Sequence, residues 1–364
     1  MDRKRILSFS LLAALICGTL YFLLRQQPIS TLAQVLRSVR PGYVALGLGL
    51  MFCFVGCEAL CTKLILGRLG HTMPYRKCLG YSFAGFYVSS ITPSSTGGQP
   101  AQIFYMSKDG IPAAHGSLNM MLIAVCYQTV TFLYAAASFF LLPQVRTALG
   151  GGLGLLLLYG GGVMILLTAG MLSMMFLPNA ARRLTGGLVG LGVRVGLVKH
   201  EDRVRAGLER QMTAYREGAA CLRANLRLVP ALLMLTFLQL TALYAVPYTV
   251  YLGFGLSGAS LFQMVGTQAL VSLAVGSLPL PGAVGAAEGV ALHAFTLFFG
   301  AGLVTPAVMV ARGISFYSFL LISGLITLCV HLSVRRRALA RDPKTSAAPP
   351  VRLPKAGQRT ALDS

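Results

Sequence analysis

Residues 276–289 read Gly-Ser-Leu-Pro-Leu-Pro-Gly-Ala-Val-Gly-Ala-Ala-Glu-Gly, in the middle of a long region that is otherwise apolar. Proline has no backbone N–H to donate and cannot sit inside an unbroken helix, and glycine permits sharp changes of backbone direction. This stretch, called the second break below, therefore predicts an interruption between two helical pieces. A break at membrane depth exposes backbone polar groups, which is tolerated only where protein or a water-filled cavity surrounds them.

A similar interruption, called the first break below, occupies residues 89–102 and reads Ser-Ser-Ile-Thr-Pro-Ser-Ser-Thr-Gly-Gly-Gln-Pro-Ala-Gln. In each break a proline precedes a glycine by four positions, Pro93 before Gly97 and Pro281 before Gly285. Two interrupted hydrophobic segments in corresponding places point to the binding site of a transporter. Paired Pro and Gly also occur in ordinary loops, so both interpretations stay open at this stage.

The composition places the chain in a membrane. Of the 364 residues 55% are hydrophobic and 11% are charged, with a mean hydropathy of +0.70, and several apolar runs exceed the length of about 18 residues that spans a bilayer. We expect an all-α polytopic protein with about six full spans and two broken, re-entrant helical hairpins, or eight spans if the hairpins cross fully. The predicted full spans are residues 6–24, 43–66, 117–142, 153–177, 228–254 and 305–332.

The net charge of +21 reflects an uneven distribution of the 31 lysines and arginines. Outside the spans they concentrate before the first span, after the second, in a basic connection at residues 178–227, and in a tail at residues 335–364 that we expect to be disordered. Cytoplasmic loops carry such an excess, so residues 1–334 are predicted to form a membrane domain with both termini in the cytoplasm. The charge then indicates contact with anionic lipid rather than with nucleic acid.

Three ionisable residues fall inside predicted membrane segments: Glu58, Glu288 and Arg312. A charge at the bilayer centre is unfavourable by a few kcal/mol or more unless it is paired or solvated, so each residue is a functional candidate with an expected partner. Arg312 is the natural partner of Glu288 or Glu58. A structural ion pair that braces the helices is the alternative, and Glu288 could instead cap the free N–H groups of its own helix.

The two breaks together predict a site for a lipid or its headgroup. Helix N-termini at residues 98–101 and 285–287 would offer unpaired N–H groups that favour a phosphate, and Arg312 would add a charge-assisted contact. The candidate binding residues are Thr92, Pro93, Gly97, Gly98, Gln99, Gln102, Pro281, Gly282, Gly285, Glu288 and Arg312.

The sequence offers little support for catalysis or for a bound cofactor. We find no HExxH, GxSxG or GxxxxGK[ST] motif and no carboxylates at acid–base spacing, so no catalytic residue, metal or cofactor is predicted. The glycine-rich runs at residues 150–154 and 160–162 lack the strand that a nucleotide-binding loop needs. They are typical of close helix packing.

The motif Leu-Pro-x-Pro-Gly-x-x-Gly-x-x-Glu-Gly at residues 278–289, the stretch from Thr92 to Gln102 and the arginine at 312 resemble the lysylphosphatidylglycerol synthetase transmembrane-domain family. This flippase-like family includes the membrane half of the multiple peptide resistance factor. The resemblance covers about residues 5–335.

The resemblance implies a lipid-handling protein of the bacterial cytoplasmic membrane. Full-length resistance factors carry a soluble domain that transfers lysine to phosphatidylglycerol, and their membrane part moves the product across the bilayer. This sequence shows no such soluble domain, so we expect a phospholipid translocase rather than an enzyme, acting on lysylphosphatidylglycerol or another lipid. A lipid aminoacyltransferase and a scaffold that recruits partners through the basic regions are the alternatives. Membrane phospholipids are the expected partners, and homo-oligomerisation stays open.

Overall fold

The computed structural model describes residues 39–148, 152–176, 213, 215–278, 280 and 282–340. The predicted first span, most of the basic connection, Pro281 and residues 341–364 lie outside the described residues. The chain divides into two compact units, Met1–Thr327 and Leu328–Ser364, and the candidate site described below lies in the first of them.

The described chain is helical and contains no strand, which confirms the predicted all-α class. Its elements are α3 (Pro41–Arg68), α4 (Tyr75–Ile91), α5 (Gly98–Lys108), α6 (Ala113–Leu141), α7 (Pro143–Ala148), α8 (Gly152–Phe176), α11 (Leu228–Tyr244), α12 (Val246–Gly253), α13 (Leu261–Val275), α14 (Ala286–Arg312), the π-helix η1 (Gly313–Ser318) and α15 (Phe319–Ala340).

Five helical segments of the described chain are long and apolar enough to cross a membrane. They are Pro41–Arg68, Ala113–Leu141, Gly154–Ser173, Leu228–Gly253 and Ala286–Val334. Each overlaps one of the predicted full spans that the structure describes, so this part of the prediction is confirmed.

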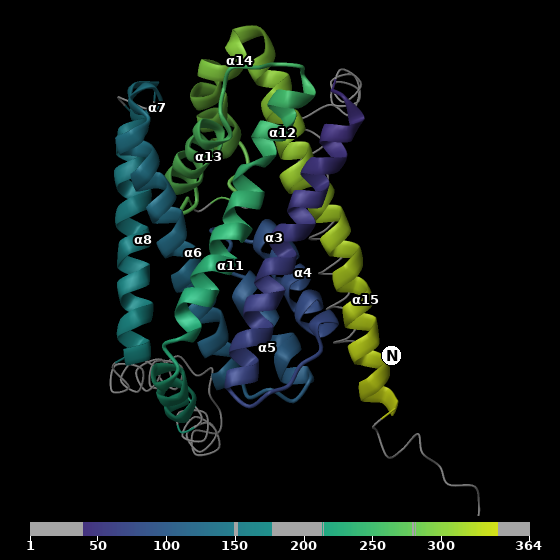
Figure 1. The fold of residues 1–364 in the computed structure, drawn as a ribbon. Coiled ribbons are helices and arrows are strands. Elements are labelled where there is room, and N and C mark those ends of the chain that lie inside the picture. The colour runs from purple at the N-terminus through teal and green to yellow at the C-terminus, as the bar shows by residue number, and fades with distance from the viewer. Residues whose placement is uncertain are drawn as a thin grey trace, which may run out of the picture. The chain divides into compact units, whose positions relative to one another are not determined.

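Helices α4 and α5 form one hairpin, and α13 forms a second with the first part of α14 (Figure 1). Gly300 divides α14, because its φ of 69° and ψ of 166° are not helical. Helix α13 has 15 residues and is therefore about 22 Å long, less than the roughly 30 Å of a bilayer core. The structure therefore supports a re-entrant second hairpin rather than two full spans.

The two hairpins enter the bundle from opposite ends of α3. At its N-terminal end the Arg40 backbone N–H donates to the Gly253 carbonyl at 3.2 Å, and Tyr251 beside it packs against Phe299 of the second hairpin. Beyond the C-terminal end of α3, Lys77 and Asp109 close the base of the first hairpin with an ion pair of 2.6 Å. The breaks at the two hairpin tips consequently point toward each other (Figure 1).

Two predicted spans have internal structure. The span at residues 228–254 is confirmed as one apolar crossing, Leu228–Gly253, made of α11 and α12, which meet at Ala245. Pro247 occupies the first turn of α12, where its missing N–H is harmless. The last span begins directly after Gly300, contains η1, and continues as α15 to Ala340. The first residues of the predicted tail are therefore helical.

Gly160 brings α8 into direct contact with α13. A Cβ atom at this position would lie 1.9 Å from the Leu273 carbonyl oxygen, whereas nothing lies within 4 Å of a Cβ at Gly161 or Gly162. The predicted packing role of this glycine run is therefore confirmed for Gly160 alone.

Gly160→Ala is expected to push α8 away from α13 and to lower the free energy of unfolding by about 1–3 kcal/mol, the usual effect of overpacking. Thermal unfolding in detergent measures this, with Gly161→Ala as the matched control. Equal unfolding midpoints for the two variants would contradict the tight contact at Gly160.

Candidate functional site

The tips of the two hairpins touch. The Ser94 hydroxyl donates a hydrogen bond of 3.3 Å to the Leu278 carbonyl, across 184 positions of sequence. A Cβ atom at Gly282 would lie 3.2 Å from the Ser90 carbonyl oxygen. The two breaks, which the sequence predicts to form one site, are therefore in contact.

Local hydrogen bonds fold the first break. Thr92 ends α4, and its hydroxyl donates to the Val88 carbonyl at 2.8 Å and accepts from the Gly97 N–H at 3.0 Å. The Thr96 hydroxyl returns to the Pro93 carbonyl at 2.9 Å. Gly97 is the N-cap of α5 and no side chain caps this helix, so its first N–H groups have no side-chain acceptor.

Gly98 allows α5 to approach α4 without a gap. A Cβ atom there would stand 1.9 Å from the Ser89 hydroxyl and 2.7 Å from the Gly85 carbonyl oxygen. On the same face, a Cβ atom at Gly85 would meet the Gln102 side chain at 2.2 Å. Two facing glycines therefore set the spacing of the first hairpin and seat Gln102 between its helices.

The second break is fixed by its own carboxylate. Gly285 has a φ of 85° and serves as the N-cap of α14, and its N–H donates to Glu288 Oε2 at 2.6 Å. Gly282 also has a positive φ, 56°, and its Cβ position is filled by the Phe316 ring. Glycine is the residue that adopts both conformations at no steric penalty. The interpretation of Glu288 as a helix cap is confirmed.

Arg312 ties the second break to the last span. Its Nε donates to Glu288 Oε1 at 2.8 Å, a terminal nitrogen donates to the Gly282 carbonyl at 3.1 Å, and its guanidinium lies 4.5 Å from the centre of the Phe316 ring. The Tyr317 hydroxyl donates to the same Glu288 oxygen at 3.3 Å. The side chains of Arg312 and Glu288 are 19% and 15% exposed, so this ion pair is largely shielded from solvent.

Arg312 was expected to pair with Glu288 or with Glu58, and it does not contact Glu58. The two carboxylate oxygens of Glu58 accept hydrogen bonds from the Gln102 amide at 2.8 Å and from the Gln239 amide at 3.5 Å. These partners come from α5 and α11, while Glu58 belongs to α3. No ion pair reaches Glu58 within the described chain.

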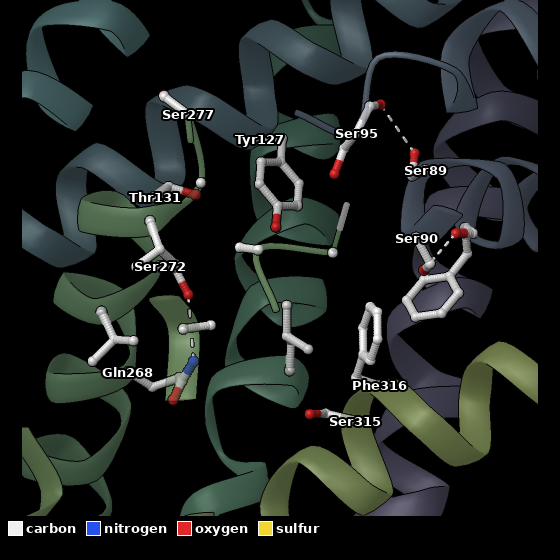
Figure 2. A pocket seen from close by; sticks show the side chains of 18 of the residues that line it. Ser89, Ser90, Ser95, Tyr127, Thr131, Gln268, Ser272, Ser277, Ser315 and Phe316 are labelled. Atoms are coloured by element: carbon white, nitrogen blue, oxygen red, sulfur yellow. Dashed lines mark hydrogen bonds between the residues drawn. The ribbon is translucent and has the colours of Figure 1, made fainter. Parts of the chain in front are cut away.

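A cavity of about 660 Å³ lies between the two breaks. Figure 2 shows Gln268 and Ser272 on one side of it and Ser90, Ser315 and Phe316 on the other, with Tyr127 between them. The predicted site residues that line the cavity are Gly98, Gln99, Gln102, Gly282 and Arg312, together with Glu58. Those that hold the breaks without lining the cavity are Thr92, Pro93, Gly97, Gly285 and Glu288. Pro281 lies outside the described residues.

Other polar residues of the cavity were not predicted as site residues, because they lie inside predicted full spans and hairpin arms rather than in the breaks. Tyr127 and Thr131 are four positions apart on α6, as are Gln268 and Ser272 on α13, so each pair shares one helix face. A face of polar groups inside an apolar helix is the signal that could have revealed them. Among the described residues, no cluster of three or more His, Cys, Asp or Glu could hold a metal ion.

The loops at the base of the first hairpin are braced by polar contacts. Asp109 accepts hydrogen bonds from Lys77 and from the Tyr81 hydroxyl, each at 2.6 Å. In the loop between α3 and α4, His71 shares a hydrogen bond of 2.8 Å with His115 of α6. Partial burial, and then the neighbouring His115, lower the pKa of His71, so this loop holds a neutral imidazole near pH 7. The first hairpin is thereby held at its base as well as at its tip.

Comparison with known proteins agrees with this architecture. The sequence profile of the lysylphosphatidylglycerol synthase TM region matches residues 6–323. A UPF0104 membrane protein of Archaeoglobus fulgidus is 21% identical over 262 residues, which are 71% of this chain and 78% of the relative. No solved structure matches the chain. Because this profile matches most of its length, the chain belongs to the family of the lysylphosphatidylglycerol synthase TM region.

Proposed function

We propose that this protein is a phospholipid translocase, which moves lipid headgroups between leaflets through the cavity between the two breaks. The observation that carries the proposal is the cavity itself, bounded by two hairpin tips that enter from opposite ends of the bundle. Its volume of about 660 Å³ lies within the range of small-molecule sites and suits a phospholipid headgroup.

The first break supplies groups that suit a phosphate. Gly98 and Gln99, the first residues of α5, line the cavity, and the helix N-terminus has no side-chain cap. N–H groups at a helix N-terminus attract anions. Hydroxyls stand beside them on the same break at Ser89, Ser90, Ser94, Ser95 and Thr96.

The second break supplies the positive charge through Arg312, which lines the same cavity. A guanidinium has five N–H donors, and Glu288 and Gly282 each take one of them. The remaining donors of Arg312 are available to a phosphate oxygen. When no lipid is bound, the ion pair with Glu288 balances the positive charge of Arg312 beside the cavity.

The side of the cavity formed by α6 and α8 suits acyl chains. Met120 and Ile123 of α6 and Met164, Leu167 and Met171 of α8 line it with flexible, apolar groups. In the apolar segment Gly154–Ser173 of α8, only 11% of the most hydrophobic stretch is buried inside the protein. The exposed faces of this helix would therefore lie against lipid. A headgroup could thus sit among the breaks while its chains remain on the apolar side.

The proposed location is the bacterial cytoplasmic membrane, with both termini in the cytoplasm. The base of the first hairpin carries Arg76, Lys77 and Lys108, close to Arg68 at the end of α3. A concentration of basic residues favours the cytoplasmic side. In this orientation the first break enters from the cytoplasm and the second from outside.

Transport by the purified full-length protein in liposomes that carry a fluorescent phospholipid tests the proposal, with a membrane-impermeant quencher reporting the leaflet. Gln99→Trp should slow transport at least about tenfold, a barrier increase of about 1.4 kcal/mol, because Gln99 lines the cavity and the larger ring would occupy part of it. The control is Phe104→Trp, on the same helix, at a side chain that is 47% exposed and does not line the cavity. No lipid movement above protein-free liposomes, from folded wild-type protein, would refute the proposed function.

A further inference from the structure

We infer that Glu58 is a proton-binding site whose protonation loosens the first hairpin from α3 and α11, so that lipid movement through the cavity is controlled by pH. The effect of pH on transport rests on the proposed function. The proton-binding site is inferred from the contacts of Glu58 alone, and a separate measurement tests it.

Glu58 joins three elements at the wall of the cavity. It belongs to α3, its Gln102 partner to the first hairpin and its Gln239 partner to α11. Gln102 and Gln239 are 6% and 1% exposed, so both amides are committed to this site rather than to solvent. The carboxylate is therefore a polar link from the first hairpin to both α3 and α11, and the Tyr75 hydroxyl of α4 makes another link to α3 by donating to the Gly56 carbonyl at 3.2 Å.

The surroundings of Glu58 suit a proton rather than a metal ion. Among the described residues no group of three or more His, Cys, Asp or Glu could hold a metal ion, and the hydrogen-bond donors to Glu58 from Gln102 and Gln239 are uncharged amides. The titratable neighbours are the Cys61 thiol on α3 and the Tyr127 phenol on α6, both neutral near pH 7, while Ser82 of α4 adds a hydroxyl. No charged side chain of the described chain is among its partners.

Gln102 is suited to both protonation states of Glu58. Its Nε2 donates to the carboxylate, while its own Oε1 is buried and has no hydrogen-bond partner. A half-turn of the amide exchanges these two atoms and would place Oε1 as the acceptor for the hydroxyl of protonated Glu58. The unused acceptor is thus explained as the group that serves the acid form.

Protonation would weaken the link between the elements. A hydronium ion in the cavity water transfers a proton to one oxygen of Glu58: an O–H bond of the hydronium breaks, an O–H bond forms on the carboxyl group, a water molecule is released, and the negative charge of Glu58 is lost. Charge-assisted hydrogen bonds are about twice as strong as neutral ones, so the first hairpin is held more firmly while Glu58 is ionised. Loss of the charge loosens this hairpin from α3 at Gln102, while the hydrogen bond from Tyr75 to the Gly56 carbonyl remains.

Two measurements on the full-length protein in liposomes test the inference. In infrared difference spectra between about pH 8 and about pH 5, a range that reaches buried carboxyl groups, the protonated-carboxyl band of Glu58 should appear, and Glu58→Gln should lack it. Transport of a fluorescent phospholipid should be about fivefold faster at the acid end, because the loss of charge roughly halves the strength of the two bonds. Glu58→Gln should be fast at both ends of the range.

Two further variants separate this role from general effects of charge. Gly85→Ala should displace the flexible Gln102 amide and shift the midpoint of both pH profiles upward, because the ionised form loses a donor. Glu217→Gln removes an exposed carboxylate and should reproduce wild-type profiles.

The inference would be overturned if no infrared band could be assigned to Glu58, or if transport by the wild type did not depend on pH. It would also be overturned if the Glu58→Gln defect were confined to amine-bearing lipids, because Glu58 would then be a headgroup contact. An infrared band without any transport by folded protein would support the proton site while the proposed function fails.

Discussion

Gly98→Ala is expected to abolish transport and to destabilise the first hairpin. The added methyl group would meet a backbone carbonyl at 2.7 Å as well as the Ser89 hydroxyl, and a backbone atom cannot rotate away as a side chain can. The free energy of unfolding should fall by about 1–3 kcal/mol, the usual range for overpacking. The larger effect should be on transport, because relieving the clash moves the N-terminus of α5 away from the cavity.

The unfolding midpoint and the liposome transport rate, measured on the same preparation, test this expectation. Gly49→Ala is the matched control, because Gly49 also lies in a helix and nothing is within 4 Å of its Cβ position. It should stabilise the protein slightly through better helix propensity and leave transport unchanged. Wild-type transport by Gly98→Ala would show that the close α4–α5 contact is not needed.

Arg312→Ala should have the second large effect. It would leave Glu288 without its counter-charge in a largely shielded environment, and it would remove the donor to the Gly282 carbonyl. Breaking one partner of such a pair costs about 3 kcal/mol. We expect a lower unfolding midpoint, disorder of the second break and loss of transport.

The variants Arg312→Lys and the double replacement Arg312→Met with Glu288→Gln separate charge from geometry. Lysine keeps the charge but lacks the planar fork that contacts Glu288 and Gly282 together, so its stability should be intermediate. The double variant should recover stability, because no unpaired charge remains, and still fail in transport. If it transports normally, Arg312 serves only to brace the helices.

Much of the fold could be predicted because its signals are local. Apolar length predicted the described spans, and proline with glycine marked both breaks. The Glu288 cap is likewise a short-range contact, three positions from Gly285. Such features depend on a few neighbouring residues, and one sequence is enough to locate them.

The partners of Glu58 could not be predicted in the same way. Charge alone favoured Arg312 as a common partner, but Arg312 pairs with Glu288, and Glu58 is satisfied by two uncharged amides from other helices. The choice depends on how α3, α5 and α11 pack, which spacing along the chain does not encode. The Tyr127 and Gln268 faces of the cavity were missed for the same reason.

The most direct test of the central claim is disulfide formation between cysteines at Ser94 and Leu278, in a chain whose eight natural cysteines are replaced. The Ser94 hydroxyl lies 3.3 Å from the Leu278 carbonyl, and a disulfide, which requires Cα atoms within about 7 Å, can form between these positions only while the two tips are in contact. The account predicts rapid cross-linking in the membrane and a reversible block of transport. Absence of the cross-link in folded protein, with both cysteines open to labelling, would contradict it.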